Sequence, residues 1–179
     1  MANYWRKRTY QQAATDSDGL AKRGLVYLMS EFFTVNSGAS VYFAIDTNDA
    51  EVEFQFYDIA SDQGEIRATL LEAPATVTQF NYITPRNLNR KFLDTAAASL
   101  SAASAVTGGT AIASELVGNT AKAGGDITQQ KVHTLRDNTI YVMQFVNVSN
   151  QSSTVHMNLG WSESDPAHYR FVDPVDPTS

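Results

Sequence analysis

The feature that most constrains this chain is a two-residue alternation of apolar and polar side chains between Leu25 and Trp161. Val52, Phe54 and Phe56, for example, alternate with acidic and amide residues. Successive side chains of a β-strand point to opposite faces of a sheet, so this alternation is typical of strands that are buried on one face. Turn residues separate the alternating segments, and no segment has the pattern of an amphipathic helix. The sequence therefore predicts an all-β fold.

We expect about ten short strands. The two most apolar segments, 139–148 and 155–161, are typical of strands at the centre of a sheet. The segments 41–46 and 51–56 are joined by a short polar turn, which predicts an antiparallel hairpin. The remaining expected strands are 25–35, 66–70, 77–83, 110–116 and 127–135.

The segment from Thr95 to Val106 is almost entirely Ala and Ser and is open to two interpretations. Helix propensity favours a helix that begins at Asp94 or Thr95 and ends before Gly108. The surrounding chain offers only sheet neighbours, however, and small side chains on a strand allow another backbone to approach closely. We therefore favour a strand.

The architecture that fits this pattern is an antiparallel β-sandwich, with the jelly roll as the leading topology, and with extended arms at both ends. A chain of 179 residues with 43% hydrophobic residues is long enough for one such core. We expect a basic N-terminal arm over residues 1–24, the sandwich domain over 25–161, and an acidic, proline-containing tail over 162–179.

The charge balance limits the classes of partner. The net charge of −6 disfavours binding to nucleic acid or to an anionic membrane. No apolar run approaches the roughly 20 residues that would span a bilayer, and no secretory signal precedes the first strand. The charged fraction of 18% is low for a freely diffusing enzyme and suits subunits that pack side by side.

The two ends are rich in charge and proline and cannot build a core of their own. Ends of this composition fray unless something holds them. Residues 1–23 are mainly basic, whereas residues 31–72 carry many carboxylates beside Arg67 alone. This separation of charge favours attraction between copies, so we interpret the ends as arms that neighbouring subunits hold in place.

The sequence shows no pattern of catalytic or metal-binding residues. The absence of cysteine excludes disulfides and thiolate sites, and His133, His156 and His168 share no metal-ligand spacing. The acidic runs 46–51 and 16–19 resemble calcium ligands but do not continue to a full EF-hand loop. We therefore expect no enzyme activity, no metal and no cofactor.

The first candidate binding segment interleaves aromatic and cationic side chains near the N-terminus. It could bind single-stranded nucleic acid by stacking and charge, or it could anchor the chain, with the Trp buried in a groove of a neighbour. Because every copy offers an acidic body, we favour the anchor. Its residues are Tyr4, Trp5, Arg6, Lys7 and Arg8.

The second candidate is a basic, asparagine-rich loop that follows the strand expected to end near Pro85. Arg86, Arg90 and Lys91 could clamp the acidic edge of a partner. Asn87 and Asn89 would hold the loop through bonds from side chain to backbone.

The same loop begins a wider resemblance. The motif Pro85-Arg-Asn-Leu-Asn-Arg90, the Gly-Gly-Thr at 108–110, the glycine-rich stretch to Gly125 and the segment 138–149 together resemble tailed-bacteriophage virion proteins. The similar proteins are capsid decoration, or cement, proteins, and the resemblance covers roughly residues 35–161. It implies a β-sandwich without catalytic residues that clips onto an icosahedral shell, commonly as a homotrimer. The implied partners are the major capsid protein and other copies of the chain.

The expected function is therefore a non-enzymatic virion structural protein that is made in the host cytoplasm. It would stabilise the phage head by bridging neighbouring capsid subunits. One alternative is a component of the tail, the baseplate or a head fibre, built on the same sandwich. A second is a carbohydrate-binding module that uses exposed aromatic residues such as Tyr42 or Tyr57.

Overall fold

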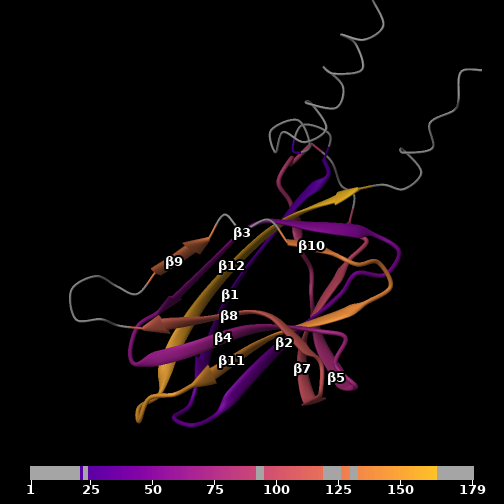
Figure 1. Cartoon of the computed structure of the whole chain (residues 1–179). Helices are drawn as coiled ribbons and strands as arrows, with labels where there is room; N and C mark the ends of the chain where they lie inside the picture. The colour runs from indigo at the N-terminus through magenta and orange to yellow at the C-terminus, as the bar shows by residue number, and fades with distance from the viewer. Residues whose placement is uncertain (1–20, 22–23, 92–94, 119–125, 130–132, 165–179) are drawn as a thin grey trace, which may run out of the picture.

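A computed structural model shows twelve β-strands among the residues that it describes (Figure 1). The structure describes residues 21, 24–91, 95–118, 126–129 and 133–164. Within residues 24–164 of this described chain, all regular elements are strands. The all-β prediction is confirmed.

The strands form two antiparallel sheets that pack face to face as a β-sandwich. In sheet A the order is β10 (His133–Leu135), β3 (Glu51–Ser61), β12 (Ser153–Ser164), β1 (Val26–Val35) and β6 (Arg86–Asn87), and β9 (Asp126–Gln129) also pairs with β3. In sheet B the order is β5 (Thr76–Ile83), β7 (Ser99–Thr107), β2 (Ser40–Asp46), β11 (Ile140–Asn147), β4 (Glu65–Glu72) and β8 (Thr110–Gly118).

The apolar members of the alternating pattern meet between the two sheets. Phe33 of sheet A lies against Phe43 and Phe145 of sheet B, with ring centroids 4.8 and 4.9 Å apart. Tyr27 and Trp161 pack together nearer one end of the sandwich, with centroids 6.1 Å apart. All five side chains belong to one core or pack against it. This core explains why the alternation constrains the fold so strongly.

The expected hairpin between the second and third strands is wrong. β2 pairs with β7 and β11 in sheet B, whereas β3 pairs with β12, β9 and β10 in sheet A. The turn between them therefore crosses from one sheet to the other. Thr47 makes this corner possible because its buried hydroxyl donates to the carbonyl of Arg136 at 2.7 Å and accepts the N–H of Thr139 at 3.0 Å.

The Ala/Ser segment is a strand, as favoured from its neighbours and against helix propensity. β7 lies between β2 and β5 in sheet B, and Leu100 and Ala103 on it are buried. The strand begins at Ser99, four residues later than the segment considered in the sequence. β11 and β12, the two most apolar strands, are both interior strands, but each belongs to a different sheet.

The last strand is longer than expected. β12 continues past Trp161 to Ser164, and both Ser162 and Glu163 are buried. Ser162, Glu163 and Ser164 therefore belong to the sandwich and not to the tail. Val26 pairs with Ser162, so β1 begins beside the end of β12, at one end of the sandwich. Apart from Ala21 and Gly24, the remaining residues of the expected arms lie outside the described residues.

Three consecutive strands extend the sheets at their edges. β5 and β7 add to sheet B beside β2, and β6 adds to sheet A beside the first residues of β1. Without them, sheet A keeps β1, β12, β3 and the short β9 and β10. Sheet B then keeps β2, β11, β4 and β8. The segment from β5 to β7 also carries the cationic loop predicted from the sequence.

Candidate partner-binding surface

The loop with the predicted cations is fastened to the beginning of β1. Arg86 pairs with Leu28 and Asn87 with Tyr27 in antiparallel register, and the N–H of Leu88 donates to the carbonyl of Val26 at 2.8 Å. Antiparallel pairing turns the side chain of Arg86 to the same face as Leu28, which is the outer face of sheet A. The loop is thus a defined projection of the sheet edge.

Two asparagines hold the loop, as the sequence predicted. The Asn87 side-chain amide donates to the carbonyl of Gly24 at 2.7 Å, and its oxygen accepts the N–H of Asn89 at 2.9 Å. The oxygen of Asn89 accepts the N–H of Lys91 at 3.1 Å. These consecutive turns are a common use of Asn in loops. They fix the backbone from which the cations extend.

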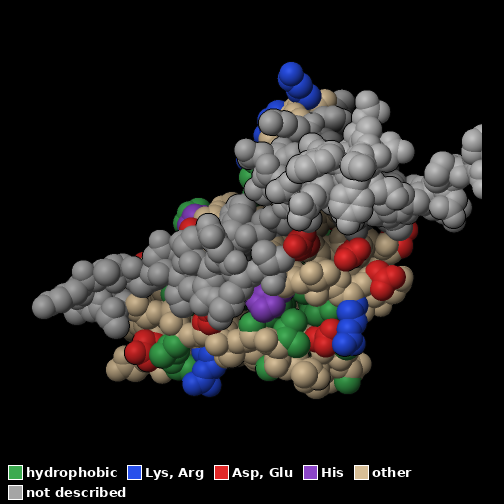
Figure 2. Space-filling view, turned by 45° about the horizontal axis from the view of Figure 1, so that its top comes forward, with side chains coloured by type: hydrophobic (Ala, Val, Ile, Leu, Met, Phe, Trp, Pro, Cys, Tyr) green, Lys and Arg blue, Asp and Glu red, His purple; other side chains and the backbone are tan. Residues whose placement is uncertain are grey.

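The three predicted cations of the loop are exposed and have no ion pair with any described residue. Arg86, Arg90 and Lys91 are all exposed. The one ion pair found in the described part of the chain joins Arg136 to Glu72, 3.5 Å apart, in another region. Figure 2 shows Lys and Arg side chains at the top of the view and Asp and Glu side chains on the right flank. No described acidic side chain therefore neutralises these three cations.

A groove lies beside this loop on sheet A. It has a volume of ≈ 840 Å³ and is lined by residues of β1, β3, β12 and the loop. Because β6 pairs only with Tyr27 and Leu28, the outer edge of the rest of β1 has no strand partner in the described chain. The groove lies beside the part of β1 that β6 does not cover. Arg86 and Arg90 both line it.

Glu163 fastens the other side of the loop segment and was missed in the sequence, where it was counted with the tail. Its carboxylate is buried and accepts three N–H groups: those of Ala97 at 2.8 Å, Ala98 at 3.0 Å and the Trp161 indole at 3.0 Å. Bonds from N–H groups to a carboxylate are stronger than those to neutral acceptors. The one available signal was the spacing, which places Glu163 on the same strand face as the buried Trp161.

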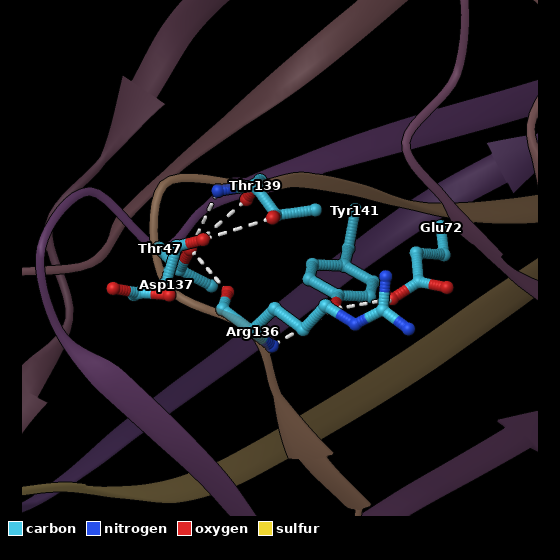
Figure 3. A network of polar contacts seen from close by, with 6 residues as sticks. All are labelled: Thr47, Glu72, Arg136, Asp137, Thr139 and Tyr141. Carbon is cyan, nitrogen blue, oxygen red and sulfur yellow. Dashed lines mark hydrogen bonds and ion pairs between the residues drawn. The ribbon is translucent and has the colours of Figure 1, made fainter.

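A second polar network ties the turns at which the chain changes sheet (Figure 3). The Tyr141 hydroxyl donates to the Glu72 carboxylate at 2.9 Å and accepts the Arg136 N–H at 2.9 Å. Burial raises the pKa of Tyr141; the bond from Arg136 opposes this shift and Glu72 adds to it. A phenol with a raised pKa stays protonated near neutral pH and is no nucleophile. The network is therefore a structural tie.

The other predicted groups are spread over the molecule. His133 lines a small cavity of ≈ 20 Å³ between the sheets, and His156 stacks on Phe32. Asp46 accepts the N–H of Asn48 at 3.1 Å, which makes the calcium-like run a turn. No group of three acidic or histidine side chains that could hold a metal is found in the described part of the chain.

Several predicted residues cannot be located. Tyr4, Trp5, Arg6, Lys7 and Arg8 lie outside the described residues, as do His168 and the acidic run 16–19. Of the two aromatic residues considered for carbohydrate binding, Tyr42 is half-buried, and its hydroxyl lies 3.5 Å from the Gln144 amide. The side chain of Tyr57 is not among those described.

The chain was compared with known proteins. A scan against protein-family models and a search of curated proteins each found no match to this sequence. In the residues that the structure describes, no helix has the length and apolar character needed to cross a membrane.

Proposed function

We propose that this protein is a virion structural protein, a capsid decoration subunit that binds the major capsid protein and bridges its neighbouring copies. The observation that carries the proposal is the cationic loop, which is rigidly fastened while its three cations remain exposed and form no ion pair with a described residue. A loop built in this way suits the binding of an acidic surface. The resemblance of the same loop motif to phage decoration proteins supports the major capsid protein as the partner.

The strand order supports a jelly roll with an insertion. β1, β12, β3 and β10 are neighbours in sheet A, and β2, β11, β4 and β8 in sheet B. In chain order, these neighbours match the eight strands of a jelly roll if β9 and β10 are counted as one interrupted strand. β5, β6 and β7 would then be an insertion that carries the cationic loop. Jelly rolls are frequent in viral capsid proteins and in lectins, so the topology is compatible with assembly but does not establish it.

In this proposal the sandwich is a rigid body and its arms and loop supply the attachment. Several modest contacts, made by linked segments, add as effective concentration. Trp5, Arg6 and Arg8 of the arm and Arg86, Arg90 and Lys91 of the loop would contact acidic surfaces of the shell or of a neighbouring copy. The protein would act as a homotrimer, without catalysis, in the virion.

Charge reversal in the loop tests this proposal. Arg86→Glu and Arg90→Glu, alone and together, are expected to lower occupancy on purified shells and to make the remaining binding less sensitive to salt. Arg67→Glu is the matched control because Arg67 is an exposed cation of sheet B and changes the net charge equally. Equal occupancy for the loop variants and the control would refute the role of the loop.

Deletion of residues 1–22 tests the arm in the same assay. We expect a large loss of shell binding by a chain that remains folded. The position of the protein on purified particles, determined by electron cryomicroscopy, separates the head from the alternatives of tail, baseplate and head fibre. Density for this chain on the tail alone would contradict the proposal.

A further inference from the structure

We propose that the groove on the outer face of sheet A binds carbohydrate, with the ring of Phe32 as the surface on which a sugar stacks. Tyr42 does not line this groove. The groove is built from described residues of three neighbouring strands and from the base of the cationic loop. Its volume of ≈ 840 Å³ lies in the range of pockets that hold ligands of the size of an oligosaccharide.

Phe32 is an exposed aromatic residue that is held rigid. Its side chain is 69% exposed, although large apolar side chains are usually buried. Its ring stacks on His156, the residue directly opposite on β12, with centroids 4.1 Å apart and planes at 5°. The His156 ring is fixed in turn by a hydrogen bond of 3.0 Å between its Nε2 and the Ser30 hydroxyl. One face of Phe32 is therefore supported, while most of the side chain stays exposed.

A row of polar side chains crosses the sheet beside this ring. Ser30 of β1 lies opposite Asn158 of β12, and Asn158 lies opposite Asp58 of β3. All three residues line the groove. Such a row, next to an aromatic ring, matches the two surfaces of a pyranose, which has an apolar ring face and a rim of hydroxyl groups.

Asp58 gives the strongest indication of a ligand. Its Oδ2 lies 3.5 Å from the Asn158 amide nitrogen, a long hydrogen bond. Its Oδ1 is buried and has no hydrogen-bond partner among the described residues. Buried carboxylate oxygens normally accept hydrogen bonds, and an ionised carboxylate can only accept. Among the described residues, its Oδ2 has only this long bond, so a ligand that reaches the Asp58 side chain must bring donors, and the hydroxyl groups of a sugar are donors.

The same carboxylate argues against an acidic polypeptide in the groove. An acidic segment would place like charge against Asp58 and would leave its Oδ1 without a donor. Arg86 and Arg90, which line the groove, can donate to sugar oxygens. The ligand class is thus an oligosaccharide.

The inference does not depend on the proposed function, because it is tested with the free, full-length protein. An array of neutral and uronic-acid oligosaccharides is probed first, and the best binder is titrated by calorimetry. We expect at least one oligosaccharide to bind, and Phe32→Ala and Asp58→Asn each to weaken its binding at least about fivefold. Phe32→Tyr keeps the ring and should bind nearly as the unchanged protein does.

Tyr82→Ala is the matched control. Tyr82 is 70% exposed, as large an exposure as that of Phe32, but it lies on β5 of sheet B. We expect it to leave the affinity unchanged within about twofold, since surface substitutions away from a site have small effects. Thermal unfolding of each variant verifies that the fold is kept.

Three outcomes would overturn the inference. They are the absence of binding to every oligosaccharide of the array, equal losses for Phe32→Ala and Tyr82→Ala, and full affinity in both Phe32→Ala and Asp58→Asn. A chain that binds shells but no oligosaccharide would make the groove a protein contact. That outcome would refute the proposed glycan site and would leave the proposed decoration function unaffected.

Discussion

Glu163 joins two segments of the chain near the cationic loop. It is 6% exposed and accepts three N–H groups. A buried carboxylate of this kind is stable only while its donors remain in place. The segment 97–98 and the end of β12 are therefore coupled through one side chain.

Replacement of this carboxylate should be costly. In Glu163→Gln one acceptor oxygen becomes an amide that faces backbone N–H groups, so we expect the free energy of unfolding to fall by about 2–3 kcal/mol. Chemical denaturation at neutral pH measures the change. Asp49→Asn, at an exposed turn, is the control and should change stability by less than about 0.5 kcal/mol. Equal effects would show that Glu163 is not a structural acceptor.

Asp62 gives a prediction about pH. Burial acts to raise the pKa of this carboxyl, but bonds from the Thr154 N–H at 2.6 Å and the Ser153 hydroxyl at 3.1 Å outweigh it and lower the pKa below 3.8. A carboxyl with a lowered pKa stabilises the fold above its unfolded pKa, and this contribution is lost as the pH falls through the folded value.

We therefore expect Asp62→Ala to lower the free energy of unfolding by about 1 kcal/mol at neutral pH. The difference from the unchanged protein should stay constant down to about pH 5 and shrink below about pH 4. Denaturation curves over this range measure it. Asp62→Asn keeps an acceptor oxygen and should show the smaller loss. A difference that grows on acidification would contradict the assigned direction.

At the scale of elements, the corner between β2 and β3 depends on a single buried hydroxyl. Thr47 is fully buried and bonds to the segment that leads from β10 to β11. In Thr47→Val the shape is kept but backbone groups of Arg136 and Thr139 lose a partner. We expect a loss of about 2 kcal/mol, measured by denaturation. Thr34→Val, on the exposed face of β1, should be nearly neutral, and a similar loss there would refute the role of the corner.

The same corner explains how far the sequence could predict the fold. Alternation identified the positions of the strands because it reports burial on one face. It could not assign β2 and β3 to different sheets, since a strand facing the core from either sheet has the same pattern. Small residues left β7 ambiguous for a related reason, because its state is decided by its neighbours β2 and β5.

The candidate site was predictable only in part. Arg86, Asn87, Asn89, Arg90 and Lys91 stand together in the chain, so composition and turn chemistry identified the loop. The groove beside it joins residues that are distant in sequence, such as Phe32 and His156. The two-residue alternation predicts that both side chains face outward. Only the register between β1 and β12 places them in contact.

At the scale of the whole molecule, the core lies within the two sheets. The buried cluster runs from Tyr27 to Trp161 and includes residues of both sheets. A chain limited to residues 24–164 should therefore fold, with a midpoint of thermal unfolding within about 5 °C of that of the full chain. Circular dichroism measures both the strand content and the midpoint. Loss of cooperative unfolding would show that the ends contribute to the core.

The pairing of Val26 with Ser162 brings the first and last strands together at one pole of the molecule. A short Gly/Ser linker could therefore join residue 164 to residue 25 with little strain. New ends could then be opened at Gly38, where the turn is exposed and has open space around it. Such a circular permutant would keep both sheets while moving its ends to the opposite pole, away from the cationic loop. Fused cargo would then be displayed at the pole opposite the pairing of Val26 with Ser162.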